Sequence, residues 1–379
     1  MLIAKTLVVA GTAAVVALTA PPAAGFRVAP PQAQQHAHHA KQRVLQRLVA
    51  QLVHDGAPGA LAVVRTPAGV RRAAGGLAEL DPRVAMKTND HFRIASVTKT
   101  FVATIVLQLA AEGRLGLDDS VERWLPGLVP DGRSITLREL LDHTSGLYNY
   151  TDDPGFVAAR IADPGREWSP RELVAVAASH PPKFPPGTGW WYSNTNYVLL
   201  GLVIEAVTGR TLADELRTRI FEPLRLAATS FPNGTAMDAP FAHAYFVSRP
   251  PLPFPAGTLV DISTTVSPSA IWAAGQIVST ADDVTRFFAA LMRRRLLPRR
   301  ELSEMKTPVA PYGYGLGLRT TDTSCGKAYG HEGDFVAYRT VVWVTSNGRR
   351  VAVMMVNIDD TRVSWDELEA AAEVALCSG

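Results

Sequence analysis

The feature that most constrains this chain is an apolar run over residues 101–110, directly preceded by a polar segment that contains Ser96 and Lys99. Within the run, apolar side chains recur at helical spacing, and Gly113 stands where a C-terminal glycine ends a helix. An almost entirely apolar helix of this length has to be buried, so we predict a globular core built around it. Ser96 and Lys99 are three residues apart, and a helix that includes both projects them from one face.

This spacing predicts a nucleophilic serine with a lysine as its partner. An amine beside a hydroxyl can activate the hydroxyl where no histidine serves as the base. The N-terminal end of a helix favours a developing negative charge near Ser96. The same helix dipole, together with burial, disfavours the charged form of Lys99 and lowers its pKa toward that of a useful base.

Composition places the chain among globular, core-forming proteins. It has 379 residues, of which 47% are hydrophobic and 19% charged, and its formal net charge is +3. This charge is too small, and too little interleaved with aromatic residues, to predict nucleic-acid binding. We interpret the arginine runs at residues 293–295 and 299–300 as a solvated helix end. No cofactor or metal site is predicted, because neither cysteine has the ligand spacing of one.

The first 24 residues have the pattern of a secretory signal peptide. Lys5 supplies a positive charge, an alanine-rich apolar run follows to residue 20, and prolines and alanines suited to cleavage follow that. The alternative is an uncleaved membrane anchor, but the run is short for a membrane span. We therefore predict a secreted or extracytoplasmic protein with a flexible leader at residues 25–40, rich in Pro, Gln and His.

Export bears on the only two cysteines of the sequence, Cys325 and Cys377. In an oxidising compartment an even pair favours a disulfide, and two unpaired thiols are the alternative. The bond would tie a C-terminal strand region to the last residues of the chain.

The periodicity of the remaining chain alternates between helices and strands. A helix is predicted over residues 41–54 and a hairpin over 60–75, and further strands are predicted at 313–318, 340–345 and 350–357. The long, proline-rich stretch 231–266 is expected to be irregular. Helices are expected at residues 136–141, 170–179, 198–207, 211–224, 281–292 and 366–376.

Two further polar groups stand where a site would use them. Tyr192 and Asn194 lie in a loop just before an apolar helix, where Tyr192 can relay a proton and Asn194 can orient a substrate amide or Lys99. His331 stands in a glycine-rich strand region that another backbone or a ligand can approach closely. For each of them a purely structural role is the alternative.

Taken together, these motifs resemble those of the penicillin-recognising serine hydrolases, the superfamily of DD-peptidases and β-lactamases. The Ser-x-x-Lys pair is a signature of this group. The Tyr192-Ser193-Asn194 triad is similar to the second motif of the class C β-lactamase and DD-carboxypeptidase branch, and His331-x-Gly333 is similar to the third motif of a secreted D-alanyl-D-alanine carboxypeptidase. The resemblance covers nearly all of the chain beyond the leader. It extends to residues 140–147, 186–188, 314–319 and 324–326.

The resemblance implies an α/β fold of the α+β type, with an antiparallel sheet flanked by helices and a mostly helical inserted domain. We expect the α/β domain to comprise residues 41–120 and 275–379 and the helical domain residues 121–274, with the site between them. The chain is expected to act as a monomer on peptidoglycan stem peptides or small acyl substrates, with β-lactams as covalent ligands.

The resemblance also implies a role for each site residue. Ser96 attacks the carbonyl of a D-Ala-D-Ala-type peptide, and proton transfer falls to Lys99 and Tyr192 without a division between base and acid. The backbone N–H groups of Ser96 and Asp334 form the oxyanion hole. Asn194 is implied to bind the substrate amide, and His331 to form a positive wall. Arg319 is implied to pair with the substrate carboxylate, and Trp272 to form a wall of the pocket.

One departure from the family pattern changes the expected substrate. The similar carboxypeptidase has threonines beside the histidine and the glycine of this motif, whereas this chain has Glu332 and Asp334. A carboxylate at Asp334 repels a C-terminal substrate carboxylate by roughly several kcal/mol at short range in a poorly solvated site. Besides a D-alanyl-D-alanine carboxypeptidase, the alternatives are therefore a β-lactamase-like esterase or amidase acting on an ester, an amide or an amine-bearing peptide, and a penicillin-binding sensor without turnover.

Overall fold

The computed structural model describes residues 31–250, 254–335, 337–359 and 362–378. From Ala40 onward the chain folds into one compact unit, and the division into an α/β and a helical domain stays a prediction. The predicted signal peptide and residues 25–30 lie outside the described residues. Within the described part of the chain, no helix is both long enough and apolar enough to cross a membrane.

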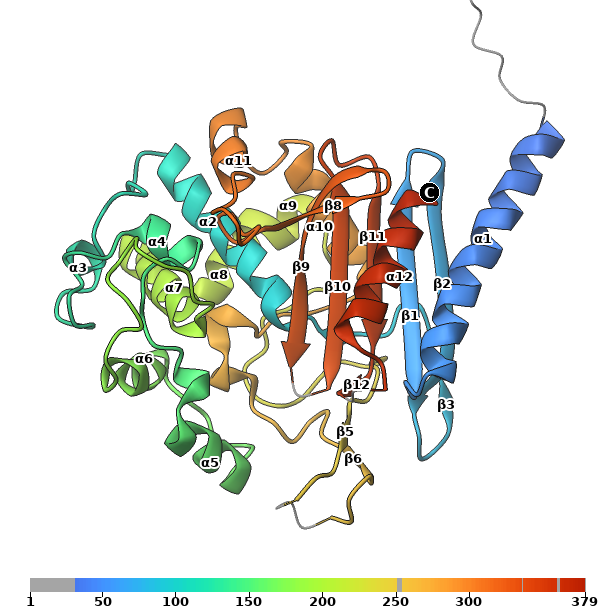
Figure 1. Cartoon of the computed structure of the whole chain (residues 1–379), viewed down its shortest axis with the longest axis horizontal. Helices are drawn as coiled ribbons and strands as arrows, with labels where there is room; N and C mark the ends of the chain where they lie inside the picture. Colours follow the sequence, from blue (N-terminus) through green and yellow to red (C-terminus); the bar gives the residue numbers. More distant parts are fainter. Residues whose placement is uncertain (1–30, 251–253, 336, 360–361, 379) are drawn as a thin grey trace, which may run out of the picture. The chain divides into compact units, whose positions relative to one another are not determined.

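A seven-stranded antiparallel sheet forms the centre of this unit (Figure 1). Its strand order is β3-β2-β1-β11-β10-β9-β8, so that β1 from the beginning of the unit pairs with β11 from its end. Antiparallel sheet and flanking helices together confirm the predicted fold class. The strands are β1 (Gly59–Thr66), β2 (Gly69–Glu79), β3 (Val84–Ala85), β8 (Arg319–Thr323), β9 (Gly326–Phe335), β10 (Tyr338–Thr345) and β11 (Val351–Val356).

The central strands are buried on both faces because helices cover the sheet from both sides. On one face, α1 (Pro31–His54) and α12 (Trp365–Cys377) supply apolar side chains that pack with alternate residues of β1, β10 and β11. On the other face, α2 (Thr98–Ala111) and α10 (Ala281–Met292) pack against the remaining alternate residues. In β1, Ala62 belongs to the first of these cores and Val63 to the second, as the two-residue period of a strand requires.

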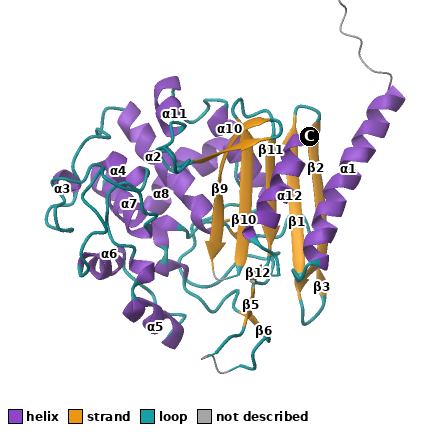
Figure 2. Cartoon of the chain, in the orientation of Figure 1, coloured by secondary structure: helices purple, strands orange, loops and turns teal. Residues whose placement is uncertain are grey.

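Helices and turns between Val121 and Leu224 gather beside this sheet (Figure 2). Capping boxes define two of the helix starts, at Thr136 and Ser169. The helical elements not yet given, within this region and outside it, are η1 (Ala95–Val97), α3 (Val121–Trp124), α4 (Leu137–Leu141), η2 (Tyr150–Asp152), α5 (Pro154–Ala162), α6 (Pro170–Ala178), α7 (Asn194–Thr208), α8 (Leu212–Leu216), η3 (Arg217–Phe221), α9 (Glu222–Leu224), η4 (Pro268–Ala270), η5 (Trp272–Ala274) and α11 (Arg299–Met305).

Three predicted elements differ from the observed ones. The first helix begins at Pro31 rather than at residue 41, because its extra residues are rich in Gln and Ala, which favour a helix, and begin with a proline. Residues 313–318 form turns and isolated bridges rather than a strand. The stretch 231–266 includes two short strands, β5 (Tyr245–Val247) and β6 (Leu259–Asp261), and β5 pairs in parallel with β12 (Ile358–Asp359).

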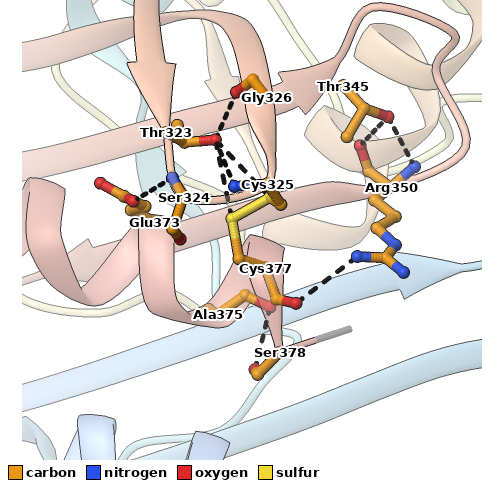
Figure 3. Close-up of a disulfide and its surroundings, with 10 residues drawn as sticks. All are labelled: Thr323, Ser324, Cys325, Gly326, Thr345, Arg350, Glu373, Ala375, Cys377 and Ser378. Atoms are coloured by element: carbon orange, nitrogen blue, oxygen red, sulfur yellow. Dashed lines mark hydrogen bonds between the residues drawn. A yellow bond between two sulfur atoms is a disulfide. The ribbon is translucent and has the colours of Figure 1, made fainter.

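Cys325 and Cys377 are joined by a disulfide in the structure (Figure 3). Their Cα atoms are 5.4 Å apart, within the usual range for a disulfide. The bond connects the turn between β8 and β9 to the end of α12, so the last helix is tied to the edge of the sheet. Glu373 of α12 also accepts a hydrogen bond from the backbone N–H of Ser324 at 2.8 Å.

Candidate active site

Ser96 lies on a tight 3-10 turn that leads directly into α2. The turn follows β4 (Phe92–Arg93), which pairs with β7 (Val278–Ser279). Its first residue, Ala95, has a φ of +48°, which a residue with a Cβ rarely adopts, so the packing around it must hold the turn in place. At the same point Gly333 of β9 approaches so closely that a Cβ would collide with the carbonyl oxygen of Ile94. The group that approaches this glycine closely, predicted as either another backbone segment or a ligand, is therefore the backbone of Ile94.

Lys99 Nζ lies 2.9 Å from Ser96 Oγ, as the spacing of the two residues predicts. The amine also donates to Asn194 Oδ1 and to the carbonyl oxygen of Ala274, each at 2.8 Å. A neutral amine has two N–H donors and one lone pair. The two carbonyl-type acceptors occupy the donors, so the lone pair is directed to the hydroxyl of Ser96.

Burial makes Lys99 a base rather than a cation. The side chain is fully buried, and in the absence of a carboxylate partner this burial lowers its pKa well below the usual value for lysine. Asn194, whose side chain was predicted to orient either a substrate amide or Lys99, holds Lys99 through its oxygen and donates to Thr151 Oγ1 at 3.2 Å through its nitrogen. Asn194 therefore positions Lys99, and the second N–H of its amide leaves the predicted substrate contact a prediction.

Tyr192 lies beside this pair with its ring 4.9 Å from Lys99 Nζ. Burial raises the pKa of Tyr192, while the hydroxyl of Ser96 and the charge of Arg319 oppose the shift. Tyr192 is thus held as a phenol, which can donate a proton or a hydrogen bond but is a poor base. The geometry therefore favours Lys99 as the base toward Ser96 and Tyr192 as the acid toward the leaving group.

His143 packs against Tyr192, a contact that was not predicted from the sequence. Its ring is 4.4 Å from that of Tyr192 and 4.8 Å from that of Tyr314. Its Nδ1 accepts a hydrogen bond from the backbone N–H of Ser193 at 3.2 Å, so the remaining proton is on Nε2. Burial lowers the pKa of His143 well below 6.5. Residues 140–147, which include His143, resemble the family pattern, but the resemblance alone implied no role for His143.

His331 does not form the predicted positive wall. Its Nε2 lies 2.8 Å from the hydroxyl of Tyr314, and its Nδ1 donates to the carbonyl oxygen of Glu332 at 2.5 Å. With one nitrogen a donor and the other an acceptor, the ring is neutral. Burial lowers its pKa well below 6.5, and the charge of Arg319 acts in the same direction.

Arg319 is also not free for the predicted contact with a substrate carboxylate. Its guanidinium is ion-paired with Glu332, and Nη1 lies 3.3 Å from Glu369 Oε1 of α12. The family arginine is thus present in this chain, but two carboxylates occupy it. Sequence reasoning missed this because Glu332 and Glu369 come together only through the packing of α12 beside the sheet.

Ser96 opens into a cavity of about 450 Å³ whose walls are mostly aromatic. The rings of Trp190 and Tyr312 stack with centroids 5.0 Å apart. Trp272, predicted as a wall, does not line the cavity, because its ring packs against Gly201 of α7. The residues that line the cavity are Ser96, Trp190, Tyr192, Tyr312, Tyr314, Arg319, His331, Glu332, Asp334 and Trp365.

Asp334 provides the carboxylate of this cavity that is least neutralised. Its side chain is 46% exposed, and its ion pair with Arg339 is long, at 3.9 Å, because Arg339 lies only 2.6 Å from Asp359. Partial burial, together with the neighbouring charge of Asp359, raises the pKa of Asp334 to about 6. Above that pH the cavity holds a negative charge, while His331 and Lys99 are neutral and Arg319 is paired.

Among the described residues, no group of three or more His, Cys, Asp or Glu side chains is arranged to hold a metal ion. The side chains brought together here are a serine, a neutral lysine that can activate it and a neighbouring phenol. The backbone N–H groups of Ser96 and Asp334 stay a predicted oxyanion hole.

Fold and site together define a serine hydrolase with a lysine base on an α/β scaffold. The chain belongs to the Beta-lactamase family, whose model matches residues 45–376. It is 30% identical over 314 residues to penicillin-binding protein 4* of Bacillus subtilis, covering 79% of this chain and 68% of that protein.

Two solved structures with high similarity are amide hydrolases by name. A D-stereospecific amidohydrolase from a Streptomyces species is 39% identical with a TM-score of 0.76, covering 88% of this chain and 98% of the other. D-amino acid amidase from Ochrobactrum anthropi, in a complex with L-phenylalanine amide, is 28% identical with a TM-score of 0.78, covering 90% of this chain and 98% of the other.

Proposed function

We propose that this chain is an extracytoplasmic serine amidohydrolase that cleaves small amides and esters of D-amino acids with a free α-amino group. The observation that carries the proposal is the charge of the cavity, in which Asp334 faces the substrate while Arg319 is occupied by Glu332 and Glu369. A substrate ammonium group finds a carboxylate partner here, whereas a terminal carboxylate finds no available cation among the described residues that line the cavity.

The proposed reaction follows from the positions of the side chains. Lys99 takes the proton of Ser96 as Oγ attacks the substrate carbonyl, and Tyr192 delivers a proton to the leaving ammonia, amine or alcohol. Water then attacks the acyl-enzyme and gives a proton to the phenolate of Tyr192. The ammonium of Lys99 returns its proton to Ser96 Oγ as the acid product leaves, so both groups regain their starting states. The aromatic walls formed by Trp190 and Tyr312 fit an apolar or aromatic substrate side chain.

The choice of D-configuration rests on the two amide hydrolases above and not on a contact in this structure. The export of the chain rests on the pattern of its first 24 residues. A D-alanyl-D-alanine carboxypeptidase is the second candidate, supported by the similarity to a penicillin-binding protein. It needs a free cation for the substrate's terminal carboxylate, and we therefore favour the amidase. β-Lactams are proposed covalent ligands of Ser96 in either case.

The test compares three substrates, D-phenylalanine amide, its N-acetyl derivative and a peptide that ends in D-Ala-D-Ala. We expect turnover of the free-amine amide with a KM at least about tenfold below that of the acetylated one, since a hydrogen bond between charged groups contributes about 1.5–3 kcal/mol. Asp334→Asn should raise this KM about tenfold or more and leave kcat nearly unchanged. Asp322→Asn, an exposed carboxylate on β8, is the matched control.

The pH dependence of KM provides a second readout of the same contact. Asp334 carries its charge only above a pKa of about 6, and a substrate α-amino group loses its own charge near pH 8. KM for D-phenylalanine amide should therefore fall as the pH rises through 6, and Asp334→Asn should abolish this fall. Faster release of D-alanine from the peptide than of ammonia from the amide would overturn the proposal in favour of the carboxypeptidase.

A further inference from the structure

A cavity larger than the one at Ser96 lies elsewhere on the protein and is lined by cations. It has a volume of about 870 Å³ and lies between the end of α10, α11 and the turn that joins β10 to β11. Four basic residues line it, and no acidic residue does. These residues are Arg293, Arg294, Arg299 and Lys306.

Helix α11 directs its acidic residues away from this cavity. Arg299, Ser303 and Lys306 follow one another at intervals of four and three residues, so they share one face, and all three line the cavity. The acidic residues of this helix, Glu301 and Glu304, line a different cavity on its other side. The cations of the first face are therefore not neutralised by their own helix.

Two of the four cations are fixed in place by the turn at residues 346–350. Lys306 Nζ donates to the carbonyl oxygen of Ser346 at 3.3 Å and lies 4.4 Å from the ring centroid of Tyr329. Arg293 Nε donates to the carbonyl oxygen of Gly348 at 3.0 Å. Burial lowers the pKa of Lys306. Among the described residues, none of the four cations forms an ion pair with a carboxylate, so the charge of the cavity lacks a counter-charge from the protein.

The basic surface continues past the same turn. A second cavity of about 640 Å³ shares Ser346 and Asn347 with the first and has no acidic lining residue. Its basic lining residues are Lys41, Lys327, Arg349 and Arg350, of which Lys327 is ion-paired with Asp322 at 3.2 Å. Figure 1 shows α11 at the end of the molecule where the β10–β11 turn lies. The site of Ser96 is elsewhere, because Tyr329 and Asp334 are five residues apart on β9, or about 16 Å along a strand.

We propose that these two cavities form one binding surface for a linear chain of phosphate groups. Guanidinium groups match phosphate oxygens in pairs, and the hydroxyl of Ser303 supplies a further donor at the wall of the first cavity. Cations on both sides of one turn suit an extended ligand better than a single anion. The ligand is a phosphate chain without bases, either a free polyphosphate or a polymer of phosphate diesters such as glycerol phosphate, which share this chemistry.

Nucleic acid fits this surface less well than a phosphate chain without bases. Binding of single strands uses exposed aromatic rings on which bases stack. The exposed aromatic side chains of the described chain, Trp191, Phe254 and Tyr312, line neither cavity. Tyr329, which lines the first cavity, is 8% exposed and is covered by Lys306.

The test measures binding of tripolyphosphate, long-chain polyphosphate and a glycerol phosphate polymer to the full-length protein by calorimetry at several salt concentrations. Affinity should rise with chain length and fall with salt, as expected when phosphate binding releases counterions. Stronger binding of the polyphosphate identifies a free phosphate chain as the ligand, and stronger binding of the glycerol phosphate polymer identifies a diester. Both results support the proposal.

A double variant assigns the binding to this surface. Arg294→Gln with Arg299→Gln should lower the affinity for long-chain polyphosphate about tenfold or more and reduce the slope of log affinity against log salt by about 2. The matched control, Arg133→Gln with Arg171→Gln, changes two exposed arginines that line neither cavity and should leave binding unchanged. Thermal unfolding shows whether each variant is folded.

Four results would overturn the proposal. They are the absence of binding to the unmodified protein, an equal loss of affinity in the control variant, equally tight binding of polyglutamate, and tighter binding of a single-stranded oligonucleotide of the same charge. The first two results would show that this surface does not bind phosphate chains. The third would show that it does not prefer phosphate to other anions, and the fourth that it binds nucleic acid. None of these readouts depends on hydrolase activity, so this proposal and the proposed function fail separately.

Discussion

At the scale of single residues, burial removes the charge from groups that are cationic in water. Lys99 and His331 are both buried with lowered pKa values, and each is held by hydrogen bonds rather than by a carboxylate. The result for Lys99 is an available lone pair beside Ser96. The result for His331 is a neutral wall, and this leaves Asp334 to determine the sign of the cavity above pH 6.

The role of Lys99 as a neutral base can be tested by Lys99→Arg. Arginine keeps the positive charge and cannot be deprotonated in a protein, so it can replace a cation but not a base. We expect kcat for the amide to fall by about 10²–10⁴-fold, the contribution of general acid–base catalysis. Lys306→Arg, at a partly buried lysine outside the site, is the control. Near-normal kcat in Lys99→Arg would show that the amine acts through its charge.

At the scale of elements, the site depends on how three segments meet. The turn before α2 brings Ser96, the start of α7 brings Asn194, and the far end of β9 brings Asp334. Helix α12 then positions Glu369 against Arg319, and the disulfide between Cys325 and Cys377 anchors that helix near its end (Figure 3).

The disulfide should stabilise the protein, and Cys325→Ser with Cys377→Ser tests this. The two cysteines are 52 residues apart, and closing a loop of this size in the unfolded chain contributes about 4 kcal/mol by the entropic account. The double variant should unfold at a lower urea concentration with a similar slope of free energy against urea. Alkylation of the protein isolated without reductant, followed by mass spectrometry, provides the control. Two alkylatable thiols without prior reduction would contradict the bond.

At the scale of the whole molecule, β1 and β11 close the sheet between the two ends of the compact unit. The neutral groups of the site are therefore neutral only while the entire fold holds. In the unfolded chain His143 and His331 regain a pKa near 6.5, so below that pH the unfolded state binds protons that the folded state excludes. Stability should consequently rise with pH between 5 and 6.5. Asp334, with a raised pKa, acts in the opposite direction between about 4 and 6.

Urea unfolding at pH 5, 6 and 7 can measure this linkage in His331→Gln. A single buried histidine that excludes its proton contributes about 1.4 kcal/mol per pH unit below 6.5. The variant should therefore show a shallower rise in unfolding free energy from pH 5 to 6, by about this amount per unit. His54→Gln, at an exposed histidine on α1, should keep the original dependence. An unchanged pH dependence in His331→Gln would mean that His331 is protonated in the folded state.

The sequence by itself determined the parts of this protein that depend on local spacing. Ser96 and Lys99 meet because residues three apart on a helix must meet, and the helix is buried because its residues are apolar. The hairpins, most of the helices and the family followed from patterns of the same kind.

Tertiary structure decided the charges and neighbours of the site. The resemblance implied a positive wall at His331, a partner for the substrate carboxylate at Arg319 and a pocket wall at Trp272. In the structure each of these side chains has other contacts. Each of these roles depends on residues far away in the sequence, such as Tyr314 and Glu369, and on burial, which no local pattern encodes. Substrate preference depends on these long-range contacts, because the net charge of a cavity is set by which ionisable groups packing brings together.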